Sequence, residues 1–179
     1  GKGMRVSADL KLQADDGTGV QIYTNDDNLE ALQDITLSLH KLDLAGLLSV
    51  VPYTPDITGV LDGDFHAIIS GKDMSISSDI RLQNLCYEGC LMGNISSEIV
   101  YMPQADGSHH VDGILYKDEK EVASIVGTYY FRDEDYIDAE ISLDDLPMNL
   151  VNGFVPDQIV GMDGYGNGTL SIKGKVSEP

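Results

Sequence analysis

Apolar residues alternate with polar ones along much of this chain, and that pattern limits the folds it can form more than any other feature. In residues 74–82, four of the five even positions are apolar, while Ser, Asp and Arg fill the odd positions. Residues 7–14 and 137–144 alternate in the same way. A period of two with one polar side is typical of antiparallel strands that have one face in solvent. The sequence therefore predicts an all-β fold.

Turn signals indicate how the strands are connected. Seven Asp-Gly or Asn-Gly pairs occur, and such pairs supply the positive φ angles of tight hairpins. Strands are expected near 89–102, 108–117, 120–132 and 136–143. The segments between them, at 103–107, 118–119 and 133–135, are short loops, and loops of this length make neighbouring strands antiparallel. We expect strand for more than about 45% of the chain, and strands longer than the usual ~5–6 residues.

Two segments interrupt the alternation. Residues 42–52 and 146–156 are rich in Leu and Val and end at a proline, which predicts short helices near 42–50 and 146–153. Each is followed by a strand with glycines four positions apart, at 59–63 and 164–168. We interpret residues 4–179 as a single fragment of a repetitive architecture. Its units would span about 35–140 and 141–179, with the second unit truncated.

The second of these segments carries a family resemblance. Residues 143–156 (LDDLPMNLVNGFVP), followed by 161–170 and Gly174, resemble the repeat of the TamB-type translocation and assembly module proteins, within the AsmA-like group of Gram-negative envelope proteins. The earlier copy, 39–71, matches more loosely, because Ala45 stands in the place of Pro147. The resemblance covers roughly residues 35–179.

The resemblance implies a fold, a location and a function. Members of this family are long β half-pipes, anchored in the inner membrane and crossing the periplasm, whose apolar concave face carries phospholipid acyl chains. It also implies a role in outer-membrane biogenesis and protein assembly, with an outer-membrane barrel protein and the neighbouring repeats of the parent chain as partners. No apolar run here approaches ~18 residues, so no membrane-spanning helix is predicted within this segment.

Two architectures suit the alternation. The first is a curved, open half-pipe sheet, because helices this short cannot cover four long strands. The alternative is a closed β-sandwich, used as a binding or adhesion module, in which Ile22, Ile35, Leu37 and Leu39 belong to a second sheet. If a groove exists, one side of each long strand should line it. The candidate lining residues are Ile76, Ile80, Leu82, Ile95, Ile99, Leu115, Ile125, Ile137, Ile141 and Leu143.

The sequence does not indicate an enzyme. No nucleophile elbow, phosphate-binding glycine loop or His-Glu-x-x-His motif is present. His109 and His110 are adjacent in a predicted strand, so they should point to opposite faces, and we interpret them as ordinary exposed side chains. We expect no catalytic residues, no cofactor and no metal. The net charge of −19 argues against nucleic acid as a partner.

Two further expectations concern the cysteines and the ends of the segment. Cys86 and Cys90 are too far apart for a disulfide within one strand, but a turn at Glu88-Gly89 would bring them across a hairpin. A disulfide and two free thiols both remain open. If the repeat continues in a parent chain, both terminal strands should present open sheet edges, through which the isolated segment would associate.

Overall fold

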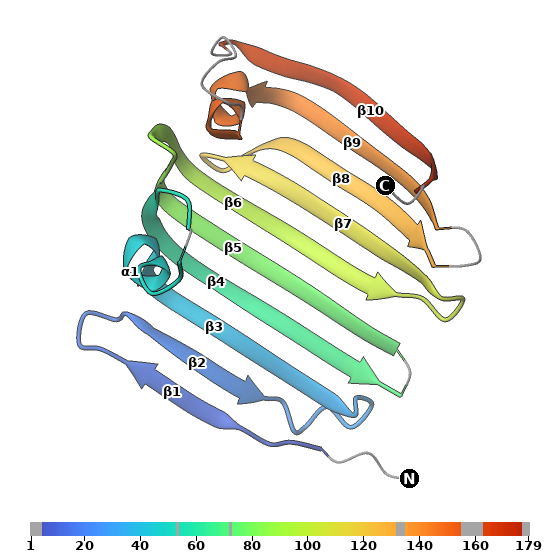
Figure 1. The fold of residues 1–179 in the computed structure, drawn as a ribbon. Helices are drawn as coiled ribbons and strands as arrows, with labels where there is room; N and C mark the ends of the chain where they lie inside the picture. The colour runs from blue at the N-terminus through green and yellow to red at the C-terminus, as the bar shows by residue number, and fades with distance from the viewer. Residues whose placement is uncertain (1–4, 53, 72, 132–134, 155–162, 177–179) are drawn as a thin grey trace.

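The computed structural model describes residues 5–176 except 53, 72, 132–134 and 155–162. Ten strands form one antiparallel sheet, and each strand pairs with its neighbours in the sequence (Figure 1). The strands are β1 (Asp9–Gln13), β2 (Gly19–Thr24), β3 (Gln33–Asp43), β4 (Ile57–Ser70), β5 (Asp73–Tyr87), β6 (Cys90–Pro103), β7 (Ser108–Lys117), β8 (Lys120–Tyr130), β9 (Tyr136–Pro147) and β10 (Tyr165–Lys175). The all-β fold, the meander and the high strand content are confirmed.

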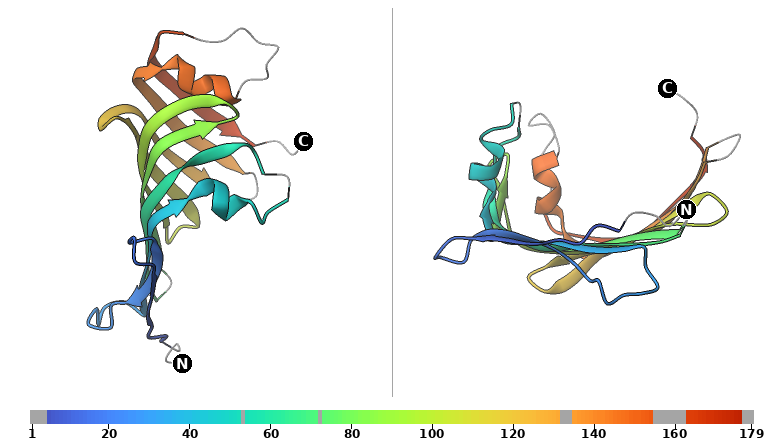
Figure 2. Two further views of the ribbon diagram at one scale, coloured as in Figure 1. Left: turned by 90° about the vertical axis from the view of Figure 1, so that its left-hand side faces the viewer. Right: turned by 90° about the horizontal axis from the view of Figure 1, so that it is seen from below.

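The sheet is a single layer that bends but neither closes nor curls strongly (Figure 2). The closed sandwich is therefore wrong, since all the described strands belong to one sheet. Ile35 and Leu37 lie in β3, which pairs with β4, so they are not part of a second sheet. The alternation of apolar and polar residues shows which side of a strand is apolar. It does not show to which sheet the strand belongs. The sheet is also flatter than the expected half-pipe.

Two short helical segments stand on the same side of the sheet, at the same end (Figures 1 and 2). Helix α1 (Leu44–Leu48) connects β3 to β4, and the 3-10 helix η1 (Met148–Phe154) connects β9 to β10. Asp43 caps α1 by accepting a hydrogen bond from the Gly46 N–H at 3.0 Å. Both fall where the Leu-rich breaks predicted helix. Pro156 and Gly161, on which the expected repeat also depends, lie outside the described residues.

The main buried cluster lies beneath these helices. Leu44 of α1 and Leu150 of η1 join Leu85 and Met92 of the sheet, each 9% exposed or less. Leu61, Leu82 and Ile95 pack around them. Among the described residues, the cluster of buried apolar side chains lies at this end of the sheet, where the two helical segments form a second layer.

Three of the β-bulges at the helix-bearing end have the same local geometry. Lys41, Asn84 and Asp145 each have φ near +50° at or next to a shift in strand register. Each donates its backbone N–H to a side-chain oxygen on the next strand, at 3.1 Å to Asp62, 3.1 Å to Asn94 and 2.8 Å to Asn167, respectively. Because bulges bend and twist a strand, this row turns the strand ends toward the side that carries the helices. Lys41 and Asp145 occupy corresponding places in the two strand–helix–strand units.

Asn167→Ala is expected to lower the free energy of unfolding by about 1 kcal/mol. The variant loses the acceptor for the Asp145 N–H and the 2.9 Å donor to the Asp145 carboxylate. Urea unfolding measures the change. Thr169→Ala, on the same strand and also exposed, is the control and should change stability by less than about 0.5 kcal/mol. Equal losses in the two variants would contradict this role for Asn167.

Both cysteines are free thiols. The turn falls at Glu88-Gly89 as expected, but Tyr87 pairs with Cys90, and Cys86 pairs with Leu91. This register places the two thiols on opposite faces of the hairpin, where they cannot meet.

A polar network fixes the link between β2 and β3. Asp34 is only 4% exposed, and its carboxylate accepts hydrogen bonds from Asn28 and His66, both at 2.7 Å. The hydrogen bond from Asn28 is the largest cause, and that from His66 the second, of a lowered pKa for Asp34. The link is therefore secured by an ionised buried group.

The stabilisation from Asp34 should depend on pH. Because its folded-state pKa is lowered, the effect is fully present above the unfolded pKa of about 3.9 and is lost as pH falls through the folded pKa. At pH 7, Asp34→Asn should cost about 1–3 kcal/mol, since its amide NH₂ would replace one carboxylate oxygen and face one of the two donors. Chemical unfolding at a series of pH values should show this difference shrinking below about pH 4. A difference that does not vary with pH, or an equal one for the exposed Asp112→Asn, would contradict the prediction.

Candidate apolar binding face

The side of the sheet that carries α1 and η1 is almost entirely apolar, and we call it the apolar face. Residues paired across neighbouring strands share a face, so the face can be followed along the register from strand to strand. One row of paired residues runs through Leu10, Ile22, Leu37, Phe65, Ser78, Ile99, Gly113, Ile125, Ile141 and Leu170. The alternation in the sequence therefore becomes a continuous surface across all ten strands.

All ten predicted lining residues lie on the apolar face. The observed register connects Ile99, Ile125 and Ile141 in one row, Ile80, Leu115 and Leu143 in a second, and Leu82 and Ile95 in a third, while Ile76 and Ile137 belong to two further rows of the same face. Leu82 and Ile95 pack against the helix cluster. Away from the helices the face is open, with Ile99 41% and Ile125 38% exposed.

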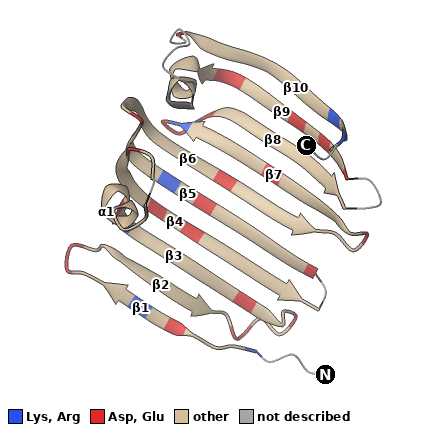
Figure 3. Cartoon of the chain, in the orientation of Figure 1, with Lys and Arg blue, Asp and Glu red and all other residues tan. Residues whose placement is uncertain are grey.

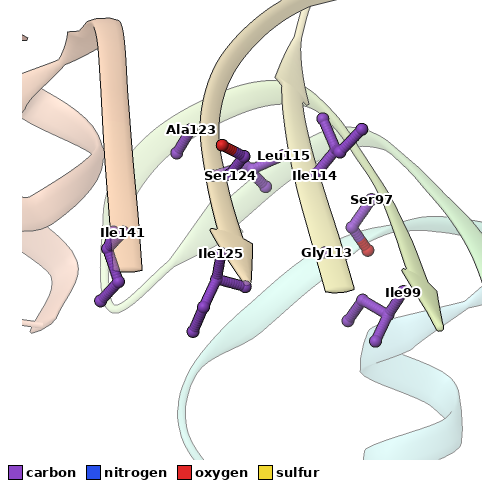
Figure 4. A pocket seen from close by; sticks show the side chains of 9 residues that line it. All are labelled: Ser97, Ile99, Gly113, Ile114, Leu115, Ala123, Ser124, Ile125 and Ile141. Carbon is purple, nitrogen blue, oxygen red and sulfur yellow. The ribbon is translucent and has the colours of Figure 1, made fainter. Parts of the chain in front are cut away.

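A first hollow, of about 280 Å³, lies on the apolar face over β6–β9 (Figure 4). Ile99, Ile125 and Ile141 extend into it, and Gly113 lies between the first two (Figure 4). A Cβ atom at Gly113 would stand 3.1 Å from Ile125 Cγ2 and 3.6 Å from Ile99 Cγ1. The missing side chain therefore leaves a depression between two β-branched neighbours.

A second hollow, of about 330 Å³, continues the first toward the end of the sheet that carries no helix, and Ile125 lines both. Its walls include Tyr101, His109, Tyr129 and Phe131. Tyr101 and His109 are stacked at 5.7 Å between ring centroids, and the Tyr101 hydroxyl contacts His109 Nδ1. Phe131 meets His109 edge-on at 4.6 Å and Tyr129 at 4.4 Å. Four rings thus gather at one end of an otherwise aliphatic surface.

A third hollow of about 280 Å³ lies over β2–β5. Ile22, Ile35 and Leu37 line it together with Phe65 and Ile76. The residues assigned to a second sheet in the sandwich alternative thus extend the apolar face toward the N-terminal edge.

By the strand register, the opposite face carries many of the acidic side chains, whose positions along the strands are marked in Figure 3. Asp64, Asp79 and Glu98 are directly paired across three strands. Ser38 donates to the Asp64 carboxylate at 2.5 Å. Like charges side by side are unfavourable inside a structure, so this face is the one that meets water.

The aromatic group at the second hollow was not predicted as a site. His109 and His110 do point to opposite faces: His109 lies in the hollow, while His110 contacts Thr128 on the polar side at 3.3 Å. The alternating pattern does place two of these side chains on the apolar face. Tyr101 lies two residues after Ile99 on β6, and His109 lies two residues before Val111 on β7. Alternation predicts the face on which a side chain lies. It does not predict that four rings contact one another, because that depends on how the strands are paired.

Within the described residues, no group of His, Cys, Asp or Glu is arranged to hold a metal ion. No helix in the same part of the chain is long and apolar enough to cross a membrane. Comparison with known protein families, curated proteins and solved structures returns no match for this chain.

Proposed function

We propose that the apolar face binds hydrocarbon chains of lipids and that this segment contributes to lipid transfer. The observation that carries the proposal is an apolar surface that is continuous over ten strands and that, among the described residues, is covered at the helix-bearing end and open elsewhere. Each Å² of apolar surface removed from water is worth about 25 cal/mol. Acyl chains are flexible and need no directional partner, so they suit a face with hollows and few polar groups.

We propose further that the parent protein is a TamB-type member of the AsmA-like group. The support is the sequence resemblance, together with long antiparallel strands in an open sheet and two strand–helix–strand units of the same order. In such a protein the sheet would be part of a half-pipe in the periplasm, within a chain anchored in the inner membrane. Its role would be non-catalytic, in phospholipid transfer and outer-membrane biogenesis, with an outer-membrane barrel protein as partner.

The sheet edges are compatible with continuation into neighbouring repeats. Among the described strands, β1 and β10 each pair with a single neighbour, so each offers a row of backbone N–H and C=O groups on its outer side. Under the proposal, neighbouring repeats of the parent chain pair with these edges, and the apolar face runs on from unit to unit. For the isolated segment, association through these edges remains the prediction.

A photoreactive fatty-acyl probe tests the function. The probe is incubated with the folded segment, irradiated, and its attachment sites are mapped by mass spectrometry. We expect adducts on side chains of the apolar face in β6–β9 and few on the polar face. Absence of adducts, or an even distribution over both faces, would contradict lipid binding. A self-contained adhesion module, the competing function, would show this negative result together with binding to a protein partner.

A further inference from the structure

We infer that the second hollow binds the ammonium head of an amphiphile whose hydrocarbon tail lies along the strands toward the first hollow. This inference rests on the proposed function, because it assigns the orientation and the head group of the lipid on the same face. Three observations carry it: the aromatic rings, a carboxylate next to them, and the direction in which the apolar lining continues.

The first observation is the chemistry of the rings. Tyr101, Tyr129 and Phe131 line one hollow, and Phe131 is 57% exposed there. The faces of aromatic rings carry negative electrostatic potential and attract ammonium groups within about 6 Å of the ring centre. Aliphatic side chains would serve a hydrocarbon tail equally well, so the rings provide an interaction that the tail does not need.

The second observation is the local charge. Asp135 directly precedes Tyr136, and Tyr136 pairs with Tyr130, so the backbone at Asp135 lies beside the end of β8 that carries Tyr129. The Asp135 side chain is also the largest cause of a raised pKa for Tyr129, which fits a negative group near this ring. No described residue that lines the hollow is Lys or Arg, and the whole chain carries a net charge of −19. The site complements a cation and repels an anion.

The third observation sets the direction of the tail. Ile125 lines both hollows, and the first hollow is bordered by Ile99, Leu115 and Ile141. Beyond it lie Leu82 and Ile95, which contact the helix cluster. The lining is thus rich in aromatic rings at one end and aliphatic toward the helices. An amphiphile satisfies both ends in one orientation only.

Three lysolipids with the same acyl chain test the inference: one with a choline head, one with an anionic glycerol-phosphate head, and one neutral monoacylglycerol. Affinities for the folded segment are measured by calorimetry below the micellar concentration. We expect the choline lipid to bind roughly three- to tenfold more tightly than the neutral one. The anionic lipid should bind most weakly.

Two variants locate the effect. Asp135→Asn removes the charge and keeps the shape, and Phe131→Leu removes one ring and keeps an apolar side chain. Each should reduce the preference for choline over the neutral lipid and leave the neutral lipid's affinity nearly unchanged. The matched controls are Asp112→Asn and Tyr130→Leu, because both residues lie on the polar face. These controls should retain the full preference.

The outcomes separate the inference from the proposed function. Equal binding of all three lipids, or a preference that survives Asp135→Asn and Phe131→Leu, overturns the head-group site and leaves acyl binding intact. Tightest binding of the anionic lipid overturns the site as well. If none of the three lipids binds, both the inference and the proposed function are wrong.

Discussion

Ile125→Glu should reduce capture of the photoreactive acyl probe by more than about tenfold while the sheet stays folded. Ile125 lines both hollows, so any chain that occupies them covers this position. A carboxylate here would lose its hydration when an acyl chain covers it, at a cost of several kcal/mol. Because the side chain is 38% exposed, the unliganded protein can keep the charge in water. Ile141→Glu, at the neighbouring position on β9, should act in the same direction.

The next residue supplies the control. Val126 is 47% exposed and belongs to the polar face, where it pairs with Asp112 and Glu140. Val126→Glu adds the same charge to the same strand, so it should leave capture of the probe at the level of the unmodified protein. Circular dichroism and thermal unfolding would check that both variants fold. Loss of capture in both, or in neither, would show that the apolar face is not the binding surface.

Leu85→Ala should produce the largest loss of stability among single substitutions in the sheet, about 2–4 kcal/mol. Leu85 is 7% exposed and packs with Leu44, Met92 and Leu150, so its removal leaves a cavity that both helices border. Leu170→Ala deletes the same atoms from a side chain that is 58% exposed and should cost less than about 1 kcal/mol. Urea unfolding of the two variants measures the difference. Similar losses would mean that the helix cluster is not the main core.

The sequence predicted the parts of this fold that depend on local pattern. The expected strand at 108–117 coincides with β7, and the one at 89–102 differs from β6 by one residue at each end. Short loops and alternation fix these elements, because a hairpin leaves little freedom in register. The helices were placed correctly, but their limits were not: Leu146 and Pro147 still belong to β9, where pairing with β10 prevails over the helical signal of the Leu-rich run.

What the sequence did not predict depends on contacts between distant residues. The alternative sandwich architecture placed Ile35 and Leu37 in a second sheet, whereas β3 joins the same sheet through β4. Asp34 and His66 are 32 residues apart, and neither shows an individual signal for the buried pair that they form. The bulge at Lys41 required a positive φ at a lysine, a conformation that residue type alone does not suggest.

The pairing of every strand with its sequence neighbours also affects how the protein acquires its structure. No described strand pairs with a partner from a remote part of the chain, and apart from the two connections that carry helices each pairing closes a short loop, which costs little entropy. Folding can therefore proceed by zippering, with hairpins added one after another to a growing edge. The reverse process should begin at β1, which is short and exposed along its whole length. Amide hydrogen exchange would then slow progressively from β1 toward the long central strands β5 and β6.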